Sequence, residues 1–221
     1  IKDVNYGENL TIYATLKANG MSDGAHIRLT LTRGEKITSG MDPRLNQSGC
    51  TLIVLAEWKA PVYQNAITLI TSSIRRNGPA NIDSKIHHNN LINNILAKIE
   101  ANNAGADDAL MLDNNGFVAE TNACNIFMIK NGMLFTPNAD ACLPGITRKT
   151  VITLCQQNNI PIHLKNISLT EMYNADQVFT TGTMGELTAV KMIDGRAIIN
   201  RSGTDLLQHI NDLFRNLTLA L

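Results

Sequence analysis

The sequence predicts an α+β fold with two domains. Segments with the two-residue apolar period of β-strands and segments with the helical period follow one another without the regular alternation of a doubly wound sheet. The glycine-rich signatures GxGxxG and GxxxxGK[ST] are both absent, which argues against the common dinucleotide and P-loop sites. With 221 residues, 44% of them hydrophobic and 17% charged, the chain can form one large packed domain or two small ones.

The charges of the chain balance, with 19 Lys and Arg residues against 19 Asp and Glu residues. A neutral chain gives no electrostatic reason to expect binding to nucleic acid or to an anionic membrane, and no apolar run approaches the length of a membrane span. The cysteines show neither a CxxC pair nor a metal-like spacing, so we expect reduced thiols, no metal site and a cytoplasmic location. They are Cys50, Cys124, Cys142 and Cys155.

The first expected domain is small and covers residues 1–60. Residues 26–33 alternate apolar and polar side chains, which predicts a half-buried strand, and residues 51–56 predict an apolar strand. The segment between them, residues 34–49, is rich in Gly, Ser, Asp and Pro and predicts a long exposed loop. Residues 57–61 interrupt the apolar pattern and end in a proline, so they are the expected linker.

The second expected domain, residues 61–221, mixes short strands with helices. Lys85 is expected to open a helix whose inward face carries Leu91, Ile95 and Ile99. The expected strands are 67–73, 109–112, 117–119, 125–130, 133–136, 177–181 and 187–193. The other expected helices are 146–157, a short one after a capping box at Ser168, and 204–217.

Three local patterns suggest chemistry, although each also has an ordinary structural interpretation. An amine at a helix start, such as Lys85, becomes nucleophilic if burial and the helix dipole lower its pKa; otherwise it is a surface lysine. Glu120 follows a strand and, if buried, needs a cationic partner such as a pyridinium nitrogen. Gly145, Ile146 and Thr147 open a helix, where free N–H groups suit a phosphate.

Two further patterns are ambiguous. The Gly/Thr-rich turn at 180–185 offers N–H groups and hydroxyls to an anion, or serves as a plain connection between strands. His87 and His88 are adjacent, and adjacent helical side chains point about 100° apart and do not share a ligand face. We therefore expect packing or hydrogen bonding from this pair rather than metal binding.

Together, these patterns resemble the class IV aminotransferases, the fold-type-IV pyridoxal phosphate enzymes. That family includes branched-chain aminotransferases, D-amino acid aminotransferases and aminodeoxychorismate lyases. The similarity runs from about residue 67 to residue 195 and implies a small N-terminal α/β sandwich domain, a larger mixed pseudo-barrel domain and a homodimer. The matching pieces are Lys85 with Asn89, residues 113–120, 125–127 and 143–148, and Gly182-Thr183 with Glu186.

The resemblance implies pyridoxal 5'-phosphate as cofactor and a role for each matched residue. Lys85 would bind the cofactor covalently and then move the α-proton of the substrate. Glu120 would keep the pyridine nitrogen protonated, and backbone N–H groups near Thr183 and Met184 would receive the substrate carboxylate. The remaining implied cofactor-binding residues are Asn125, Gly145, Ile146, Thr147, Gly182 and Thr183.

The sequence also departs from the family pattern. Branched-chain enzymes usually carry a tyrosine where this chain has Asn90, and the upstream HxxRL-type arginine that grips the phosphate is not found. We therefore expect that the chain lacks the first several dozen residues of its protein. Residues 43–46 faintly resemble the PRxH carboxylate clamp of D-amino acid enzymes, with Asn46 in place of the histidine. Arg44 and Arg33 are accordingly candidate substrate ligands.

The expected function is pyridoxal phosphate-dependent transfer of an amino group between an amino acid, branched-chain L-amino acids first, and a 2-oxo acid. D-amino acid transamination and aminodeoxychorismate lysis remain alternatives within the family. A non-catalytic relative that kept the fold would be marked by loss of Lys85 or Glu120, and both are present. The sequence contains no GxSxG nucleophile turn, which argues against a hydrolase with a catalytic serine. The expected partners are small molecules and a second copy of the chain.

Overall fold

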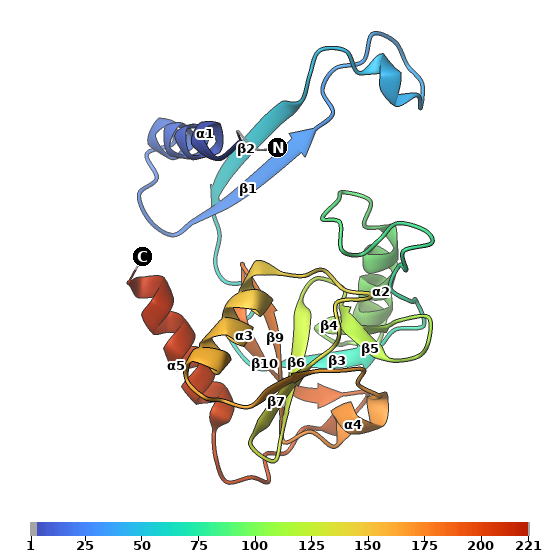
Figure 1. Cartoon of the computed structure of the whole chain (residues 1–221), viewed down its shortest axis with the longest axis vertical. Coiled ribbons are helices and arrows are strands. Elements are labelled where there is room, and N and C mark those ends of the chain that lie inside the picture. Colours follow the sequence, from blue (N-terminus) through green and yellow to red (C-terminus); the bar gives the residue numbers. More distant parts are fainter. Residues whose placement is uncertain (1–3, 221) are drawn as a thin grey trace. The chain divides into compact units, whose positions relative to one another are not determined.

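Figure 1 shows the computed structural model of the chain, which describes residues 4–220. The chain divides into two compact units, Ile1–Pro61 and Val62–Leu221. Within residues 4–220, no helix combines the length and the apolar character needed to cross a membrane.

The first unit contains one helix and one antiparallel strand pair. Its elements are α1 (Val4–Ala18), β1 (Ala25–Thr32), the 3-10 helix η1 (Pro43–Leu45) and β2 (Thr51–Trp58). The register runs from Ala25 opposite Trp58 to Thr32 opposite Thr51, and it confirms the two predicted strands. Strand β2 extends through Trp58, into residues expected to be linker. Helix α1 was not predicted because its apolar residues follow no clear helical period.

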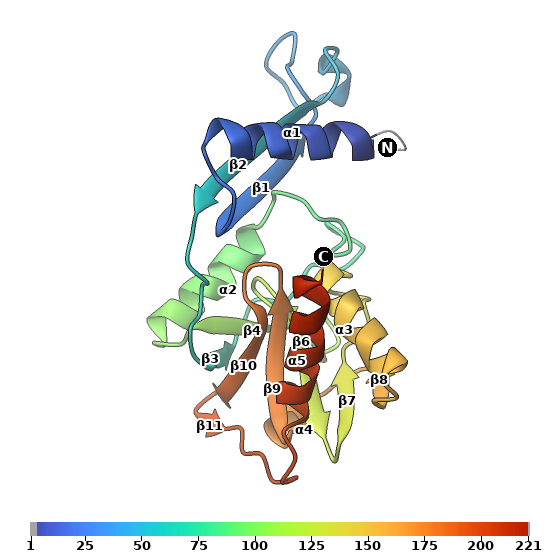
Figure 2. The same ribbon diagram turned by 90° about the vertical axis from the view of Figure 1, so that its left-hand side faces the viewer.

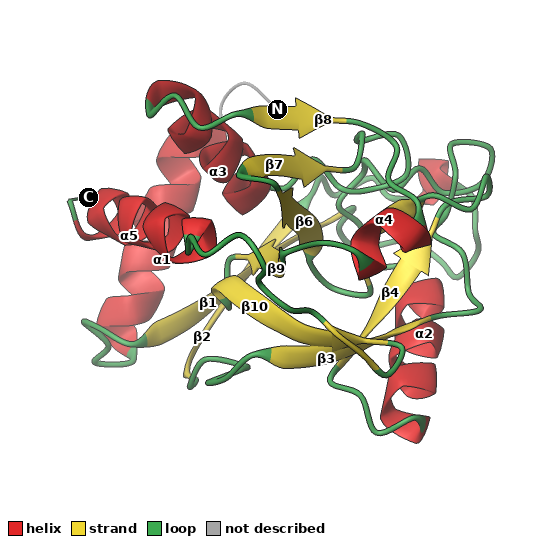
Figure 3. Ribbon diagram, turned by 90° about the horizontal axis from the view of Figure 1, so that it is seen from below, coloured by secondary structure: helices red, strands yellow, loops and turns green. Residues whose placement is uncertain are grey.

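The second unit is built on a mixed nine-stranded sheet that curls, as Figure 3 shows. Its strands are β3 (Ile67–Thr71), β4 (Asp108–Leu112), β5 (Val118–Thr121), β6 (Asn125–Lys130), β7 (Met133–Thr136), β8 (Ile162–Leu164), β9 (Gln177–Gly182), β10 (Glu186–Ile193) and β11 (Arg196–Ala197). Their order is β5-β4-β3-β10-β9-β6-β7-β8, with β11 paired to β10. The α+β class and all seven predicted strands of this unit are confirmed.

Four helices accompany this sheet in the described part of the chain: α2 (Ile92–Asn103), α3 (Ile146–Gln157), α4 (Leu169–Tyr173) and α5 (Leu206–Leu219). Helices α3 and α5 lie beside each other in Figure 2 and share one buried cluster with β6 and β9. In that cluster the rings of Phe127 and Phe179 stack with centroids 5.0 Å apart. Ile210 and Phe214 of α5 are buried in the same cluster.

The prediction that Lys85 opens a helix is wrong, because α2 begins only at Ile92. Lys85 lies instead in a turn, where the Asp83 carboxylate accepts its backbone N–H at 3.0 Å and the Asp83 carbonyl accepts the N–H of Ile86 at 3.0 Å. Residues 87–90, with the sequence His-His-Asn-Asn, are weak helix formers. Local side-chain hydrogen bonding therefore wins over helix formation here.

The predicted inward face of α2 is also wrong. Leu91, Ile95 and Ile99 are 42%, 57% and 47% exposed, whereas Ala97 and Ala101 are fully buried. The alanines pack in one cluster with residues of β4. Their small side chains let the helix approach the sheet closely, so within the described residues the larger apolar side chains lie on the opposite, exposed face.

The capping box predicted at Ser168 is confirmed and gives the first testable prediction. The Ser168 hydroxyl accepts the Glu171 N–H at 3.3 Å, while the Glu171 carboxylate accepts the Ser168 N–H at 2.9 Å. Ser168→Ala should lower the free energy of unfolding by about 1 kcal/mol, because a helix-start N–H loses its partner. Urea denaturation measures this. Ser48→Ala, at an exposed serine of the first unit, is the control, and equal losses in both variants would contradict the capping role.

Candidate active site

Glu120 lies at the centre of the candidate site, on β5 opposite Met111 of β4, and is only 5% exposed. Three donors reach its carboxylate within the described residues. Arg76 Nη2 lies 2.6 Å from Oε1, the Leu143 N–H donates to Oε1 at 3.3 Å, and Asn125 Nδ2 donates to Oε2 at 3.0 Å. Since a carboxylate offers about four acceptor sites, one remains for a further donor.

Burial raises the pKa of Glu120 to about 7, against the opposing effects of Arg76, the Leu143 N–H and Arg148. Desolvation disfavours the charged carboxylate, while the cations and the N–H donor favour it. The carboxyl group is therefore poised between its two protonation states near neutral pH. An additional cationic N–H at the free acceptor site would stabilise the charged form.

The start of helix α3 faces this carboxylate. Gly145 is the N-cap residue and provides no side-chain cap, so the first N–H groups of the helix stay available to a ligand. A Cβ at Gly145 would come within 2.2 Å of Asn125 Oδ1, so only glycine fits. Asn125 Nδ2 also donates to the Leu143 carbonyl at 2.8 Å. One amide thus connects the Glu120 carboxylate to the loop that leads into α3.

Except for Lys85, the residues expected to bind the cofactor line one pocket of about 200 Å³. They are Glu120, Asn125, Gly145, Ile146, Thr147, Gly182 and Thr183. The hydroxyl oxygen of Thr181 in the same pocket is buried and has no hydrogen-bond partner among the described residues. The pocket therefore joins a carboxylate at one side to helix N–H groups and threonine hydroxyls at the other, which suits a ligand with a cationic nitrogen and an anionic group.

The remaining expected site residues lie elsewhere. Lys85 is exposed and lines none of the three pockets near Glu120 and the β9–β10 turn. His87, two residues after Lys85, does line the 200 Å³ pocket that contains Glu120. Arg33 and Arg44 are exposed residues of the first unit, and the Arg44 guanidinium pairs with Asp42.

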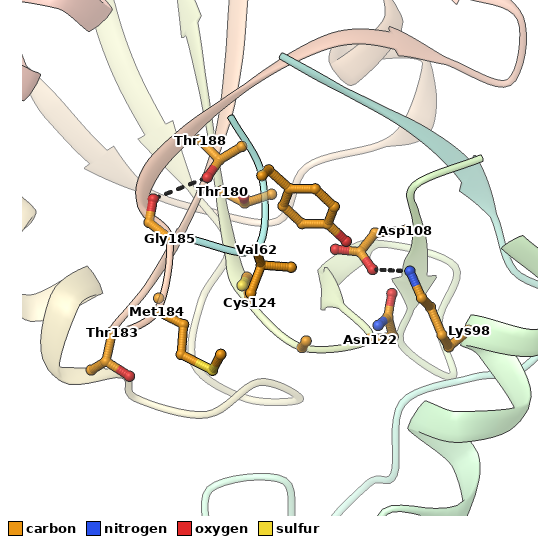
Figure 4. Close-up of a pocket in the computed structure, with 13 residues that line it drawn as sticks. Val62, Lys98, Asp108, Asn122, Cys124, Thr180, Thr183, Met184, Gly185 and Thr188 are labelled. Carbon is orange, nitrogen blue, oxygen red and sulfur yellow. Dashed lines mark hydrogen bonds and ion pairs between the residues drawn. The ribbon is translucent and has the colours of Figure 1, made fainter. Parts of the chain in front are cut away.

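Met184 lines a second, larger pocket of about 340 Å³, shown in Figure 4. This pocket shares Cys124, Gly182 and Thr183 with the first. Lys98 and Asp108, paired at 3.0 Å, lie on one side of it. The two pockets therefore adjoin each other at the start of the β9–β10 turn.

The sequence analysis assigned no role to Arg76, which follows β3. No local sequence pattern distinguishes an arginine whose side chain enters the core from one whose side chain stays in solvent. The contact of Arg76 with Glu120 is therefore visible only in the tertiary structure. Burial raises the pKa of Cys124 to about 12 and that of Cys142 to about 12, which is the opposite of the lowered pKa of an activated thiol. Among the described residues, no group of His, Cys, Asp and Glu side chains is arranged to hold a metal ion.

The raised pKa of Glu120 predicts how stability depends on pH. Between the ordinary value of 4.5 and about 7, the folded chain holds a proton on Glu120 that the unfolded chain has lost. The unfolding free energy should therefore fall as pH rises through this window, by at most about 1.4 kcal/mol per pH unit from this group. Glu120→Gln should remove that contribution in urea denaturation from pH 4.5 to 8. Glu35→Gln, at an exposed carboxyl of the first unit, is the control, and unchanged slopes in Glu120→Gln would contradict the assignment.

Comparison with known proteins identifies the family. The model of the family described as amino-transferase class IV matches residues 10–193. Branched-chain-amino-acid aminotransferase-like protein 2 of Arabidopsis thaliana is 58% identical over 94% of this chain. The match covers 37% of that relative, so the chain spans less than two fifths of its length.

Solved structures agree with this result. The branched-chain aminotransferase of Thermoproteus uzoniensis with norvaline superposes with a TM-score of 0.88 at 30% identity, over 96% of this chain and 71% of that one. The T.th. branched-chain amino acid aminotransferase with pyridoxamine 5'-phosphate gives a TM-score of 0.82 at 32% identity, over 92% of this chain and 67% of that one. The family model covers well over half of the residues, and the chain belongs to the class IV aminotransferases.

Proposed function

We propose that this chain carries the cofactor site of a cytoplasmic, pyridoxal phosphate-dependent aminotransferase. The proposed reaction moves an amino group between an amino acid and a 2-oxo acid, with branched-chain L-amino acids as the favoured donors. The observation that carries the proposal is the pocket joining the free acceptor site of Glu120 to the start of α3. The relatives support it, since one is named with the pyridoxamine form of the cofactor.

The pocket residues fit the cofactor. Ile146 and Thr147 would hold its phosphate through their backbone N–H groups, with the hydroxyls of Thr147 and Thr183 beside them. The unpaired Thr181 hydroxyl is a further donor that such an anion would satisfy. When bound, pyridoxal phosphate supplies an electron sink for the charge left on the substrate when its α-proton is removed. Glu120 would hold a proton on the ring nitrogen and so strengthen that sink.

Lys85 is the proposed covalent anchor and the proposed carrier of the α-proton. Its turn is fixed at one end, where the buried Ser84 hydroxyl donates to the Asn77 carbonyl at 2.7 Å, and His87 lines the pocket beyond it. Lys85 itself points to solvent in this structure. The proposal therefore requires the turn at 85–91 to rearrange when the cofactor binds.

The second pocket is the proposed site of the substrate side chain. It adjoins the first at Gly182 and Thr183, so a substrate carboxylate on the N–H groups near Thr183 and Met184 would direct its side chain there. Arg33 and Arg44 remain proposed anion ligands. The D-amino acid alternative has less support, because the Asn46 side chain donates to the Gly34 carbonyl at 2.9 Å and so has a structural role within its loop.

An absorption spectrum of the purified protein with pyridoxal phosphate tests the proposal. We expect a yellow band from lysine-bound cofactor that L-leucine bleaches and that 2-oxoglutarate restores. Bleaching by D-alanine alone would favour the D-amino acid enzyme, and release of product without an acceptor would favour a lyase. No band would contradict the proposed function.

Lys85→Ala tests the lysine in the same assay. The yellow band should be lost, because no other described lysine is proposed to reach the cofactor, and turnover should fall by at least about 10³-fold. Lys165→Ala, at a half-buried lysine paired with Glu171 outside the pocket, should keep both signals. A surviving band in Lys85→Ala would refute the assignment.

The proposal includes a homodimer. The apolar face of α2 supports the homodimer. Its side chains Leu91, Ile95 and Ile99 are exposed and are not covered by other described residues. Obligate homodimers bury hydrophobic surfaces of this kind, and a two-fold axis lets one helix contact its own copy. A second copy of the chain is the proposed occupant.

Ile95→Glu tests this surface. A charge in the middle of the apolar face should shift the protein from dimer to monomer in sedimentation velocity, because an unpaired buried charge disfavours association. Leu164→Glu, on the 48%-exposed Leu164 of β8, is the matched control and should stay dimeric. Equal sedimentation of Ile95→Glu and the unaltered protein would remove α2 from the interface.

A further inference from the structure

Arg76 is an arginine buried beside the proposed cofactor site without a role in the function described so far. Its side chain is 8% exposed, and that of Glu120 is 7% exposed. Arg76 Nη2 lies 2.6 Å from Glu120 Oε1, and Nη1 donates to Asn94 Oδ1 at 2.8 Å. The Arg76 backbone N–H donates to the Leu112 carbonyl at 2.9 Å, which ties the residue to the end of β4.

The partner of Arg76 is held in turn. Asn94 of α2 donates through Nδ2 to the Asn122 carbonyl at 2.7 Å, in the turn that follows β5. Arg76 and the side-chain amide of Asn94 therefore connect α2, the end of β4 and the strand that carries Glu120. An arginine suits this place because its planar guanidinium can donate to two differently placed acceptors at once, which a lysine ammonium does less well.

The other titratable groups that face Glu120 have weaker contacts. Arg148 of α3 favours the charged carboxylate from a distance, and its Nη2 donates to the Pro137 carbonyl at 2.8 Å. The thiols of Cys124 and Cys142 are near enough for Glu120 to raise their pKa values. His87 and His88 both line a pocket to which Glu120 and Arg76 contribute. Of the charged side chains in the described residues, Arg76 is therefore the one in direct contact with the carboxylate.

We propose that Arg76 is the positioning residue of Glu120, fixing its carboxylate at the pocket and keeping it charged so that the shared proton stays on the cofactor's ring nitrogen. This inference rests on the proposed function for the identity of the ring. The effect of Arg76 on the position and charge of Glu120 does not depend on the identity of the ligand, and it is expected in the cofactor-free protein as well.

The physical argument concerns one proton between two bases. A buried carboxyl and a pyridine nitrogen beside it share a proton, and the more basic partner keeps it. A cation in contact with the carboxylate lowers the carboxylate's proton affinity. It would act less strongly on the nitrogen of a ring bound at the free acceptor site, which it would not contact directly. With Arg76, the charged carboxylate faces a protonated ring. Without Arg76, burial would leave Glu120 holding the proton itself, and the ring would withdraw electrons less well.

The test begins with the cofactor-free, full-length protein. The side-chain carboxyl of ¹³C-labelled Glu120, identified by its absence in Glu120→Gln, is titrated by NMR in the unaltered protein, Arg76→Met and Arg76→Lys. We expect a midpoint near 7 in the unaltered protein, an upward shift of about 1–3 pH units in Arg76→Met, and a midpoint near the original in Arg76→Lys. Arg215→Met, at an exposed arginine 3.8 Å from Glu186, is the control and should not move the midpoint.

The second stage uses the loaded enzyme. Arg76→Met should bind pyridoxal phosphate but lose at least about 10-fold in kcat with little change in KM, and Arg76→Lys should recover part of that loss. An unshifted Glu120 midpoint in folded Arg76→Met overturns the inference, as does full kcat in that variant. Failure of the unaltered protein to bind pyridoxal phosphate would instead overturn the proposed function, while the titration still decides whether Arg76 controls Glu120.

Discussion

A carboxylate buried in the nine-stranded sheet is the constraint to which the rest of the site conforms. Removing a charged carboxylate from water costs several kcal/mol unless donors replace the lost hydration. Arg76, the Leu143 N–H and Asn125 supply them, from three different parts of the second unit. The raised pKa of Glu120 shows that these donors offset the burial only in part. A ligand that brings a further cationic N–H would complete the set, and this links the folding requirement to the proposed cofactor.

Asn125 gives the site its internal geometry. One side-chain amide donates both to Glu120 and to the Leu143 carbonyl, and its oxygen lies where a side chain at Gly145 would have to go. The proposed ring contact and the proposed phosphate contact are therefore held at a fixed separation by one residue at the start of β6. The turn of Lys85, in contrast, is held mainly by local hydrogen bonds. The residues of the proposed ring and phosphate contacts are thus linked to each other, whereas the proposed lysine anchor, Lys85, lies on a separate turn whose contacts are local.

The elements that the sequence predicted well are those whose signals are local. Residues 146–157 form a helix as predicted, and the capping box at Ser168 places α4, because period and cap are properties of neighbouring residues. The pocket residues from Glu120 to Thr183 followed from the family resemblance, and the fold brings them together. The inward face of α2 and the contact of Arg76 could not be predicted in this way. Both depend on the shape and polarity of the sheet surface around β4. That surface is formed by residues far apart in the sequence, so a local stretch of sequence does not reveal it.

Helix α2 connects the chemistry of the site to the proposed assembly. Ala97 and Ala101 press it against the sheet, Asn94 holds Arg76 in contact with Glu120, and the helix begins where the turn of Lys85 ends. Its opposite face carries the exposed apolar side chains that a second copy would cover in the proposed homodimer. A partner that fixed α2 from outside would also fix the Asn94 amide and the end of the Lys85 turn. In that arrangement, subunit association and the protonation state of Glu120 depend on the same helix, so loss of the dimer should weaken the site even though the pocket residues all belong to one chain.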